Sequence, residues 1–236
     1  MFKQLMAAFK KTVAEHELEK EPLKVRCRAL TVDEAIGNPE DNDYPIQRGK
    51  EKMVQAEFRG HFGQAFSCEI SRGDYTIEEV LKLSLESDWE RAVFLSALNA
   101  VYAALGITDR TIHCKDQEPV ECASKLGKIV EPGKKVALFG LQPRFLEKLD
   151  ELGEVRCVDL DPDLVNEKKC GVLIEPIEKS EEVMDWCDMA LVTGSATVND
   201  SFDFFLNRDK PVHIFGTTGA ATAEILDMPR FCHCAK

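Results

Sequence analysis

Apolar residues recur in the first part of the chain with two different periods. From Phe2 to Glu19 they are spaced three and four residues apart, which predicts an amphipathic helix with one buried face. From Leu23 to Leu30 apolar and basic residues alternate, which is typical of a half-buried strand. Met53 to Phe58 and Gln64 to Ile70 are predicted to form two more strands, joined by a hairpin connection through Arg59 to Gly63.

Two helices are predicted next. Thr76 and Glu79 have the spacing of a capping box at the start of a short helix. A longer helix from Trp89 to Leu105 has its apolar residues on one face, and Gly106 is suited to end it. A helix, then strands, then helices predict an α+β domain over residues 1–130.

After residue 131 the pattern changes to strands that alternate with helices, which predicts a parallel sheet and a Rossmann-like domain over residues 131–236. The whole chain is therefore expected to have an α/β fold. The expected strands are Lys135 to Phe139, Val155 to Asp159, Gly171 to Ile174, Met189 to Thr193 and Val212 to Phe215. The expected helices are Pro143 to Leu152, Ser180 to Cys187, Asp200 to Asn207 and Ala220 to Leu226.

Composition narrows the class of protein. An apolar content of 44% and a charged content of 31% are ordinary for a globular protein, and no apolar run is long enough to span a bilayer. The N-terminus does not have the pattern of a signal peptide, so we expect a cytoplasmic protein whose nine cysteines are mostly reduced. The net charge of −12 makes nucleic acid and anionic membranes poor partners. Whether the chain forms a homo-oligomer is left open.

The ends of the first two predicted parallel strands carry candidate ligand residues. Gly140 follows the first strand, where a glycine lets a ligand approach the backbone. Asp159 lies 19 residues further on, near the separation at which an acidic side chain binds a ribose hydroxyl. The turn has one glycine where the dinucleotide motif needs three, so pyrophosphate binding is disfavoured. An adenosine cofactor such as S-adenosylmethionine stays open.

The strongest candidates lie in two turns rich in glycine and hydroxyl side chains. The first turn contains Thr193, Gly194, Ser195 and Asn199, and the second contains Gly216, Thr217 and Thr218. Such turns expose backbone amides and hydroxyls that suit an anionic group, although the same residues are also ordinary helix caps. Asn99, a polar residue inside an apolar helix, is predicted either to hold the surface between the domains or to touch the ligand.

The C-terminal tail contains three soft metal ligands, Cys232, His233 and Cys234. Thiolate and imidazole suit zinc, copper(I) or another soft transition metal, and His113-Cys114 is a candidate second pair. The alternative is a terminal strand with buried cysteines and an exposed histidine. Apart from this possible soft transition metal, the identity of a cofactor is left open.

Four segments together resemble a known family. They are Leu191 to Ser201, Val212 to Thr218, Leu98-Asn99-Ala100 and Lys135 to Gly140. These segments are similar to the family described as "putative heavy-metal chelation", formerly a domain of unknown function. The resemblance implies an enolase N-terminal-like α+β domain, a Rossmann-like domain and a site in the cleft between them. It also implies a role in heavy-metal chelation or in biosynthesis of a metal-carrying or pterin-like cofactor. Gly216-Thr217-Thr218 departs from the family's Gly-Pro-Ser or Gly-Pro-Thr loop, which leaves the ligand open.

Three functional hypotheses follow. The first is a cleft that binds a small anionic or metal-chelating molecule. The second is a non-catalytic soft-metal-binding protein that uses the Cys-His-Cys tail. The third is an enzyme with an adenosine cofactor. No nucleophile or general base can be assigned from the sequence, so whether the protein is an enzyme stays open.

Overall fold

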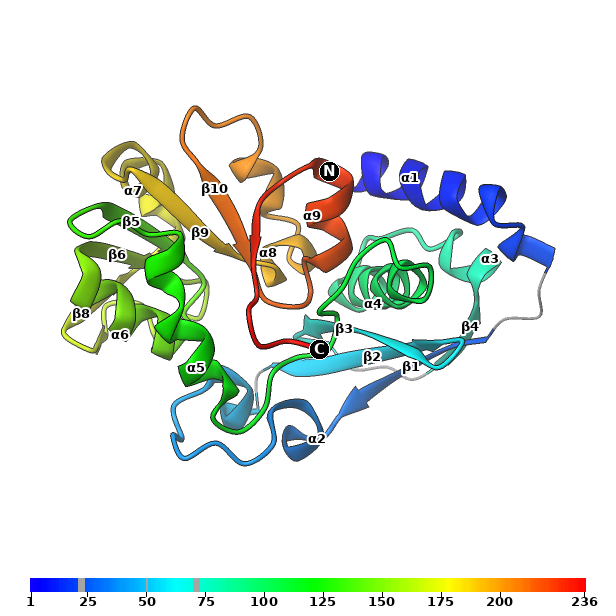
Figure 1. Cartoon of the computed structure of the whole chain (residues 1–236), viewed down its shortest axis with the longest axis horizontal. Helices are drawn as coiled ribbons and strands as arrows, with labels where there is room; N and C mark the ends of the chain where they lie inside the picture. Colours follow the sequence, from blue (N-terminus) through cyan, green and yellow to red (C-terminus); the bar gives the residue numbers. More distant parts are fainter. Residues whose placement is uncertain (21–23, 50, 70–72) are drawn as a thin grey trace.

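The computed structural model describes residues 1–20, 24–49, 51–69 and 73–236. Leu23 and Ile70, the end residues of two predicted strands, lie outside the described residues. The fold is built around two separate sheets with helices packed on and between them (Figure 1). One sheet has four strands and the other has seven.

The strands and helices have the following bounds. The four-stranded sheet contains β1 (Lys24–Leu30), β2 (Lys52–Phe58), β3 (His61–Ser67) and β4 (Gly73–Thr76). The seven-stranded sheet contains β5 (Lys135–Phe139), β6 (Glu154–Val158), β7 (Lys168–Lys169), β8 (Val172–Glu175), β9 (Met189–Thr193), β10 (Val212–Phe215) and β11 (Arg230–Phe231). The α-helices are α1 (Phe2–Glu15), α2 (Val32–Ile36), α3 (Ile77–Val80), α4 (Asp88–Ala104), α5 (Glu118–Ser124), α6 (Pro143–Leu152), α7 (Ser180–Trp186), α8 (Ser195–Val198) and α9 (Ala220–Leu226). The 3-10 helices are η1 (Leu18–Lys20), η2 (Pro45–Arg48), η3 (Leu126–Lys128), η4 (Ile177–Lys179) and η5 (Phe202–Phe205).

The four-stranded sheet is antiparallel, with the order β3-β2-β1-β4. The predicted hairpin between β2 and β3 is present, but its turn is only Arg59-Gly60, and residues 61–63 belong to β3. Both turn residues have positive φ, at 49° and 78°, and a two-residue turn of this kind follows the natural twist of a hairpin. The capping box predicted at Thr76 and Glu79 is also present, at the start of α3.

The seven-stranded sheet has the order β11-β10-β9-β5-β6-β8-β7 and is parallel except for the pairing of β7 with β8. Its first strand along the chain, β5, lies next to β9, and the chain proceeds outward from this pair in opposite directions. This is the strand order of a Rossmann fold, in which ligands bind beyond the carboxyl ends of the two central strands. The α/β fold class expected from the sequence is confirmed.

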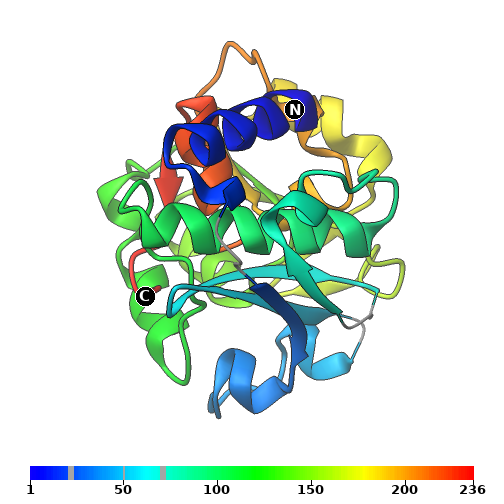
Figure 2. The same ribbon diagram turned by 90° about the vertical axis from the view of Figure 1, so that its right-hand side faces the viewer.

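Helix α4 joins the two halves into a common core. It lies between α1 and the four-stranded sheet (Figure 2) and is buried over most of its length. Phe94 and Leu98 of α4 share a hydrophobic cluster with Val198 of α8 and Ala221 of α9. The two halves are therefore packed together through apolar side chains. The division into domains at residues 1–130 and 131–236 stays a prediction.

The expected helix from Asp200 to Asn207 is wrong. The chain forms α8 before this segment and only the single 3-10 turn η5 within it. Asp200 and Asn207 have φ values of 59° and 57°, in the left-handed region, so an α-helix cannot run through either residue. Helices α2 and α5 and strands β4 and β11 were not expected from the sequence. In the described part of the chain, no helix combines the length and apolar character needed to cross a membrane.

Candidate functional site

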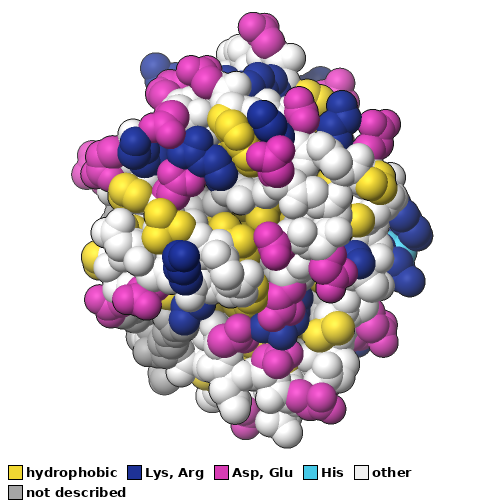
Figure 3. All heavy atoms as spheres, turned by 90° about the vertical axis from the view of Figure 1, so that its left-hand side faces the viewer, with side chains coloured by type: hydrophobic (Ala, Val, Ile, Leu, Met, Phe, Trp, Pro, Cys, Tyr) yellow, Lys and Arg dark blue, Asp and Glu magenta, His cyan; other side chains and the backbone are white. Residues whose placement is uncertain are grey.

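A cavity of about 540 Å³ lies between the two halves of the molecule. One wall, called here the strand-end wall, consists of the residues that follow β5, β6, β9 and β10. The other, called here the N-terminal wall, comes from the stretch 36–46, Glu51, the end of β3 and the stretch 113–122. The volume of the cavity is that of a typical small-molecule site. On the face of the molecule that carries the seven-stranded sheet, hydrophobic side chains gather at the centre, with acidic and basic side chains interspersed around them (Figure 3).

The two turns predicted to form a site lie side by side in the strand-end wall. Strands β9 and β10 are parallel neighbours, with Thr193 paired to Phe215, so their following turns share one edge of the sheet. Gly216 has a φ of 87° and open space where a side chain would be, so its backbone faces the cavity without obstruction. The predicted ligand residues that line the cavity are Gly140, Asp159, Thr193, Gly194, Ser195, Asn199, Gly216, Thr217 and Thr218.

Asn99 does not line the cavity. Its side chain is 1% exposed and makes hydrogen bonds on both sides of the boundary between the halves. Nδ2 donates to the carbonyls of Gln64, Thr217 and Thr218 at 3.1, 3.1 and 3.2 Å, and Oδ1 accepts from the amide of Ala221 at 2.8 Å. Asn99 therefore holds the β10 turn against β3, which is the structural one of its two predicted roles.

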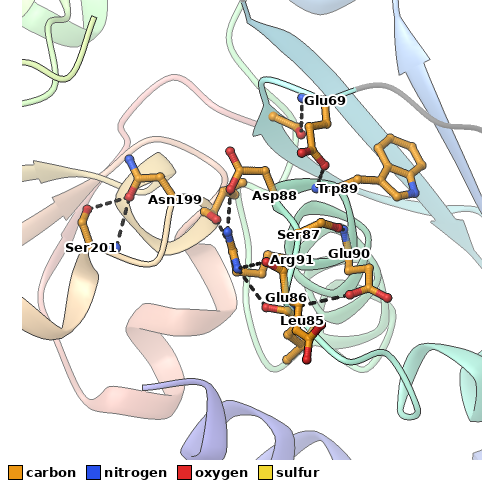
Figure 4. Close-up of polar contacts among 12 residues, drawn as sticks. Glu69, Leu85, Glu86, Ser87, Asp88, Trp89, Glu90, Arg91, Asn199 and Ser201 are labelled. Atoms are coloured by element: carbon orange, nitrogen blue, oxygen red, sulfur yellow. Dashed lines mark hydrogen bonds and ion pairs between the residues drawn. The ribbon is translucent and has the colours of Figure 1, made fainter.

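Two other predicted residues use their side-chain oxygens to shape the wall. Asp159 accepts the amide of Leu141 through Oδ2 at 2.6 Å and the amide of Asp161 through Oδ1 at 2.8 Å. Asn199 accepts through Oδ1 from both the amide and the hydroxyl of Ser201, at 3.2 and 2.6 Å (Figure 4). Both side chains fix the loops that border the cavity.

Arg91, in α4, lies beside this wall, and its positive charge is balanced by groups of the protein itself. Its guanidinium donates to the carbonyls of Val198, Leu85 and Glu86 and forms an ion pair with Asp88 at 2.6 Å (Figure 4). Asp88 contributes to the cavity lining, whereas Arg91 does not. The ion pair therefore positions a carboxylate at the cavity edge.

The described lining contains four carboxylates and no lysine or arginine. The carboxylates belong to Glu51, Asp88, Asp159 and Asp161. Burial, reinforced by the charges of Asp159 and Asp161, raises the pKa of Glu51 to about 7. Glu51 can therefore gain or lose a proton near neutral pH. Glu51 was not among the predicted site residues, because the stretch Gly37 to Lys52 is rich in Asn, Asp, Pro and Gly and has the composition of a loop.

Two buried hydroxyl groups in the lining have no hydrogen-bond partner among the described residues. They are Oη of Tyr44, in the N-terminal wall, and Oγ1 of Thr217, in the strand-end wall. Burial raises the pKa of Tyr44 to about 12, so this side chain is a phenol at neutral pH. The adjacent Thr218 differs, because its Oγ1 accepts the amide of Phe66 at 3.1 Å. An unpaired buried hydroxyl costs free energy, and a ligand in the cavity would recover it.

His113 is the only histidine of the described lining. Burial lowers its pKa, which favours the neutral ring. Nδ1 lies 2.6 Å from the carbonyl of Cys114, and because a carbonyl only accepts, the ring proton is assigned to Nδ1. This leaves the lone pair on Nε2 for a ligand or a metal. The amide of His113 also donates to Oε1 of Gln64 at 2.7 Å.

The three tail residues predicted as metal ligands are not equivalent. Cys232 is buried and lines the cavity, Cys234 is partly buried, and His233 is exposed. In the described ranges no group of three or more histidine, cysteine or acidic side chains is placed to hold a metal ion. The Cys-His-Cys ligand set therefore stays a prediction without a converged site.

The protein is thus of the α/β class, with a Rossmann-type sheet, a separate antiparallel sheet and an acidic cavity between them. The resemblance noted in the sequence is confirmed, since residues 123–229 match the model of the DUF364 family, described as "Putative heavy-metal chelation". No curated protein matches the chain in sequence.

Two solved structures share the fold. The first is a DUF364 protein of unknown function from Pyrococcus horikoshii, with a TM-score of 0.54 and 18% identity, covering 91% of this chain and 80% of that chain. The second is a DUF364 protein of unknown function from Desulfitobacterium hafniense, with a TM-score of 0.51 and 15% identity, covering 74% of this chain and 72% of that chain. At such identities the likeness concerns the fold alone. The enolase-like assignment of the first 130 residues stays a prediction.

Proposed function

We propose that the cavity binds a small, neutral or cationic molecule that chelates metals, such as a pterin-like heterocycle. The observation that carries this proposal is a cavity of about 540 Å³ whose described charged groups are all carboxylates. The sequence left an anionic ligand and a metal-chelating ligand open. Four carboxylates in a lining without lysine or arginine, of which Asp88 is paired with Arg91 outside the lining, leave a negative potential, which opposes an anionic ligand.

The unpaired groups of the lining support a ligand with both donors and acceptors. Tyr44 and Thr217 each offer a hydroxyl that can donate or accept. Glu51, with its pKa of about 7, accepts a hydrogen bond when ionised and donates one when protonated. A pterin ring has amide-like and amino groups that match this set, and its adjacent ring nitrogen and carbonyl oxygen chelate a metal ion.

A matched pair of probes tests the charge preference directly. Thermal unfolding is measured with pterin and with pterin-6-carboxylate, which adds one negative charge to the same ring. Pterin should raise the melting temperature, because a ligand that binds the folded state stabilises that state. Pterin-6-carboxylate should raise the melting temperature less, because the acidic lining repels its added negative charge. In the Ser195→Trp variant, whose added ring occupies the cavity, the shift should disappear. Ser124→Trp, at an exposed position outside the lining, is the control.

Two outcomes would count against the proposal. One is a larger stabilisation by the carboxylate than by pterin, which would mean that the acidic lining does not govern binding. The other is an equal response to pterin in wild type and Ser195→Trp, which would place the ligand elsewhere.

A second candidate function is binding of S-adenosylmethionine. Asp159 directly follows β6, the strand next to β5, where an acidic residue of a Rossmann fold contacts ribose. The sulfonium cation also suits an acidic lining. Stabilisation by S-adenosylmethionine that is lost in Asp159→Asn, with no response to pterin, would favour this function over the first.

A further inference from the structure

The two ends of the cavity differ in chemistry. Asp159 and Asp161 follow β6, whereas Phe231 is the last residue of β11, which is four strands away in the order of the sheet. All three residues line the cavity. At about 4.8 Å per strand, the two ends lie roughly 19 Å apart along the edge of the sheet. The cavity is therefore elongated, and carboxylates stand at one of its ends.

Three aromatic rings of the seven-stranded half line the opposite end. Phe215 and Phe231 are the last residues of the neighbouring parallel strands β10 and β11. The ring centre of Phe145, in α6, lies 5.2 Å from that of Phe215 and 5.6 Å from that of Phe231. The three residues belong to one hydrophobic cluster and all line the cavity. They form a continuous apolar surface.

Two further rings face this end from the N-terminal wall. Phe66 and His113 have ring centres 5.6 Å apart and ring planes at 89°, which is an edge-to-face contact. The amide of Phe66 donates to Oγ1 of Thr218 at 3.1 Å, which places the pair at the turn after β10. The five rings are called here the aromatic end of the cavity. Burial lowers the pKa of His113, so none of them carries a charge at neutral pH.

A bare pterin ring leaves part of this cavity unfilled. At about 30 Å³ per water molecule, a volume of about 540 Å³ has room for about 18 of them. Pterin has about a dozen non-hydrogen atoms, and bonded atoms pack more closely than the molecules of a liquid. An apolar space holds water poorly and binds an aromatic ring such as benzene instead. The unfilled part therefore favours an apolar group on the ligand.

We propose that the ligand is a pterin-like heterocycle with an uncharged aromatic substituent, which lies in the aromatic end. This inference rests on the proposed function and narrows its class of ligand. The amino group of the heterocycle is directed toward the carboxylates, because ionised carboxylates only accept hydrogen bonds. Carbons 6 and 7, at the opposite edge of the pterin ring, then face the aromatic end. An anionic substituent would find no lysine or arginine of the described lining to pair with.

A series of matched pterins tests the inference on the wild-type protein. Pterin, 6-phenylpterin and 7-phenylpterin are titrated, and the change in pterin fluorescence gives each Kd. One of the two phenylpterins should bind at least about tenfold more tightly than pterin, because burial of a phenyl ring supplies a gain of this order. The same compound with a carboxylate on its phenyl ring should lose the gain, because a charge buried without a partner is costly.

A pair of substitutions on β3 locates the substituent. Phe66→Ala removes one ring of the aromatic end and keeps the backbone bond to Thr218, so it should reduce the advantage of the phenylpterin over pterin at least about threefold. Phe62→Ala is the matched control, because Phe62 is also partly buried on β3 but lies outside the lining. It should leave both Kd values unchanged. Circular dichroism checks that each variant is folded.

The outcomes separate this inference from the proposed function. If pterin binds and neither phenylpterin binds more tightly, the inference is wrong while the proposed function stands. An equal advantage of the phenylpterin in wild type and folded Phe66→Ala would also overturn it, because the substituent would then lie elsewhere. If none of the pterins binds, the proposed function fails and the inference fails with it. If Phe66→Ala does not fold, the ligand series on the wild type decides alone.

Discussion

The two walls of the cavity use their polar groups in opposite ways. In the strand-end wall, Asp159 and Asn199 bond the backbone of their own loops, and Thr218 bonds β3. In the N-terminal wall, Glu51 has a raised pKa and the hydroxyl of Tyr44 has no described partner. The strand-end wall is therefore a frame held by its own hydrogen bonds, in which the hydroxyl of Thr217 has no described partner. The N-terminal wall supplies groups that a ligand would complete.

The largest expected effect concerns the frame. Asn99→Ala removes four hydrogen bonds and leaves buried backbone groups of both halves unpaired. We expect a loss of about 3 kcal/mol in the free energy of unfolding. Urea unfolding measures it, with the exposed Asn42→Ala as control. A loss no greater than that of the control would show that Asn99 does not hold the two halves together.

Gly194 tests how closely the turns of the frame are packed. A Cβ at this position would collide with the backbone nitrogen of Gly219, at the start of α9. Gly194→Ala should therefore destabilise the protein by about 2 kcal/mol. Gly127→Ala adds the same methyl group where nothing lies within 4 Å and should have little effect in the same urea titration. Equal stability of the two variants would mean that the β9 and β10 turns can move apart.

Glu51 tests the N-terminal wall through pH. Its pKa is raised from 4.5 to about 7 in the folded protein, so the folded state holds this proton more tightly than the unfolded chain. The resulting stability is present below pH 4.5 and is lost as the pH rises toward 7. Glu51→Gln should therefore match wild type near pH 4.5 and exceed it by about 2 kcal/mol at pH 8.

The control for this pH series is Glu57→Gln, on the neighbouring strand β2 and outside the cavity lining. Its difference from wild type should not change over the same range. Parallel stability curves for wild type and Glu51→Gln would contradict a desolvated carboxylate in the cavity.

The smallest expected effect comes from two neighbouring threonines with the same 1% exposure. Thr217→Val removes a hydroxyl without a described partner and should stabilise the ligand-free protein by up to about 1 kcal/mol. Thr218→Val removes the acceptor of the Phe66 amide and should destabilise it by about 1 kcal/mol. Thermal unfolding of both variants measures the contrast. The same sign of change in both would remove the distinction between a bonded and an unbonded hydroxyl.

The frame was predictable from sequence because its signals are local. Buried parallel strands appear as short apolar runs between helices, and the rule that parallel strands end at one edge brings the Thr193 and Gly216 turns together. Asn99 was also noticeable, as a polar residue in an apolar helix. Which of its two possible roles it has depends on contacts with Gln64 and Ala221, which no local pattern reveals.

The N-terminal wall could not be predicted in the same way. Glu51 and Tyr44 stand in a segment with few apolar residues, and Tyr44 is buried by packing with Leu30 and Met53, which come from other segments of the chain. The segment from Asp200 to Asn207 shows a second limit. It was expected to be one of the helices between the parallel strands, but Phe202 and Phe205 pack into the core from a single 3-10 turn. Tertiary packing prevailed over local preference in both places.

A crystal structure grown with pterin tests most directly whether the N-terminal wall completes the site. The ring should lie in the cavity, with hydrogen bonds to the hydroxyls of Tyr44 and Thr217 and to the carboxyl group of Glu51. A pterin bound outside the cavity, or one that contacts only the Thr193 and Gly216 turns and leaves Glu51 and Tyr44 untouched, would contradict this account.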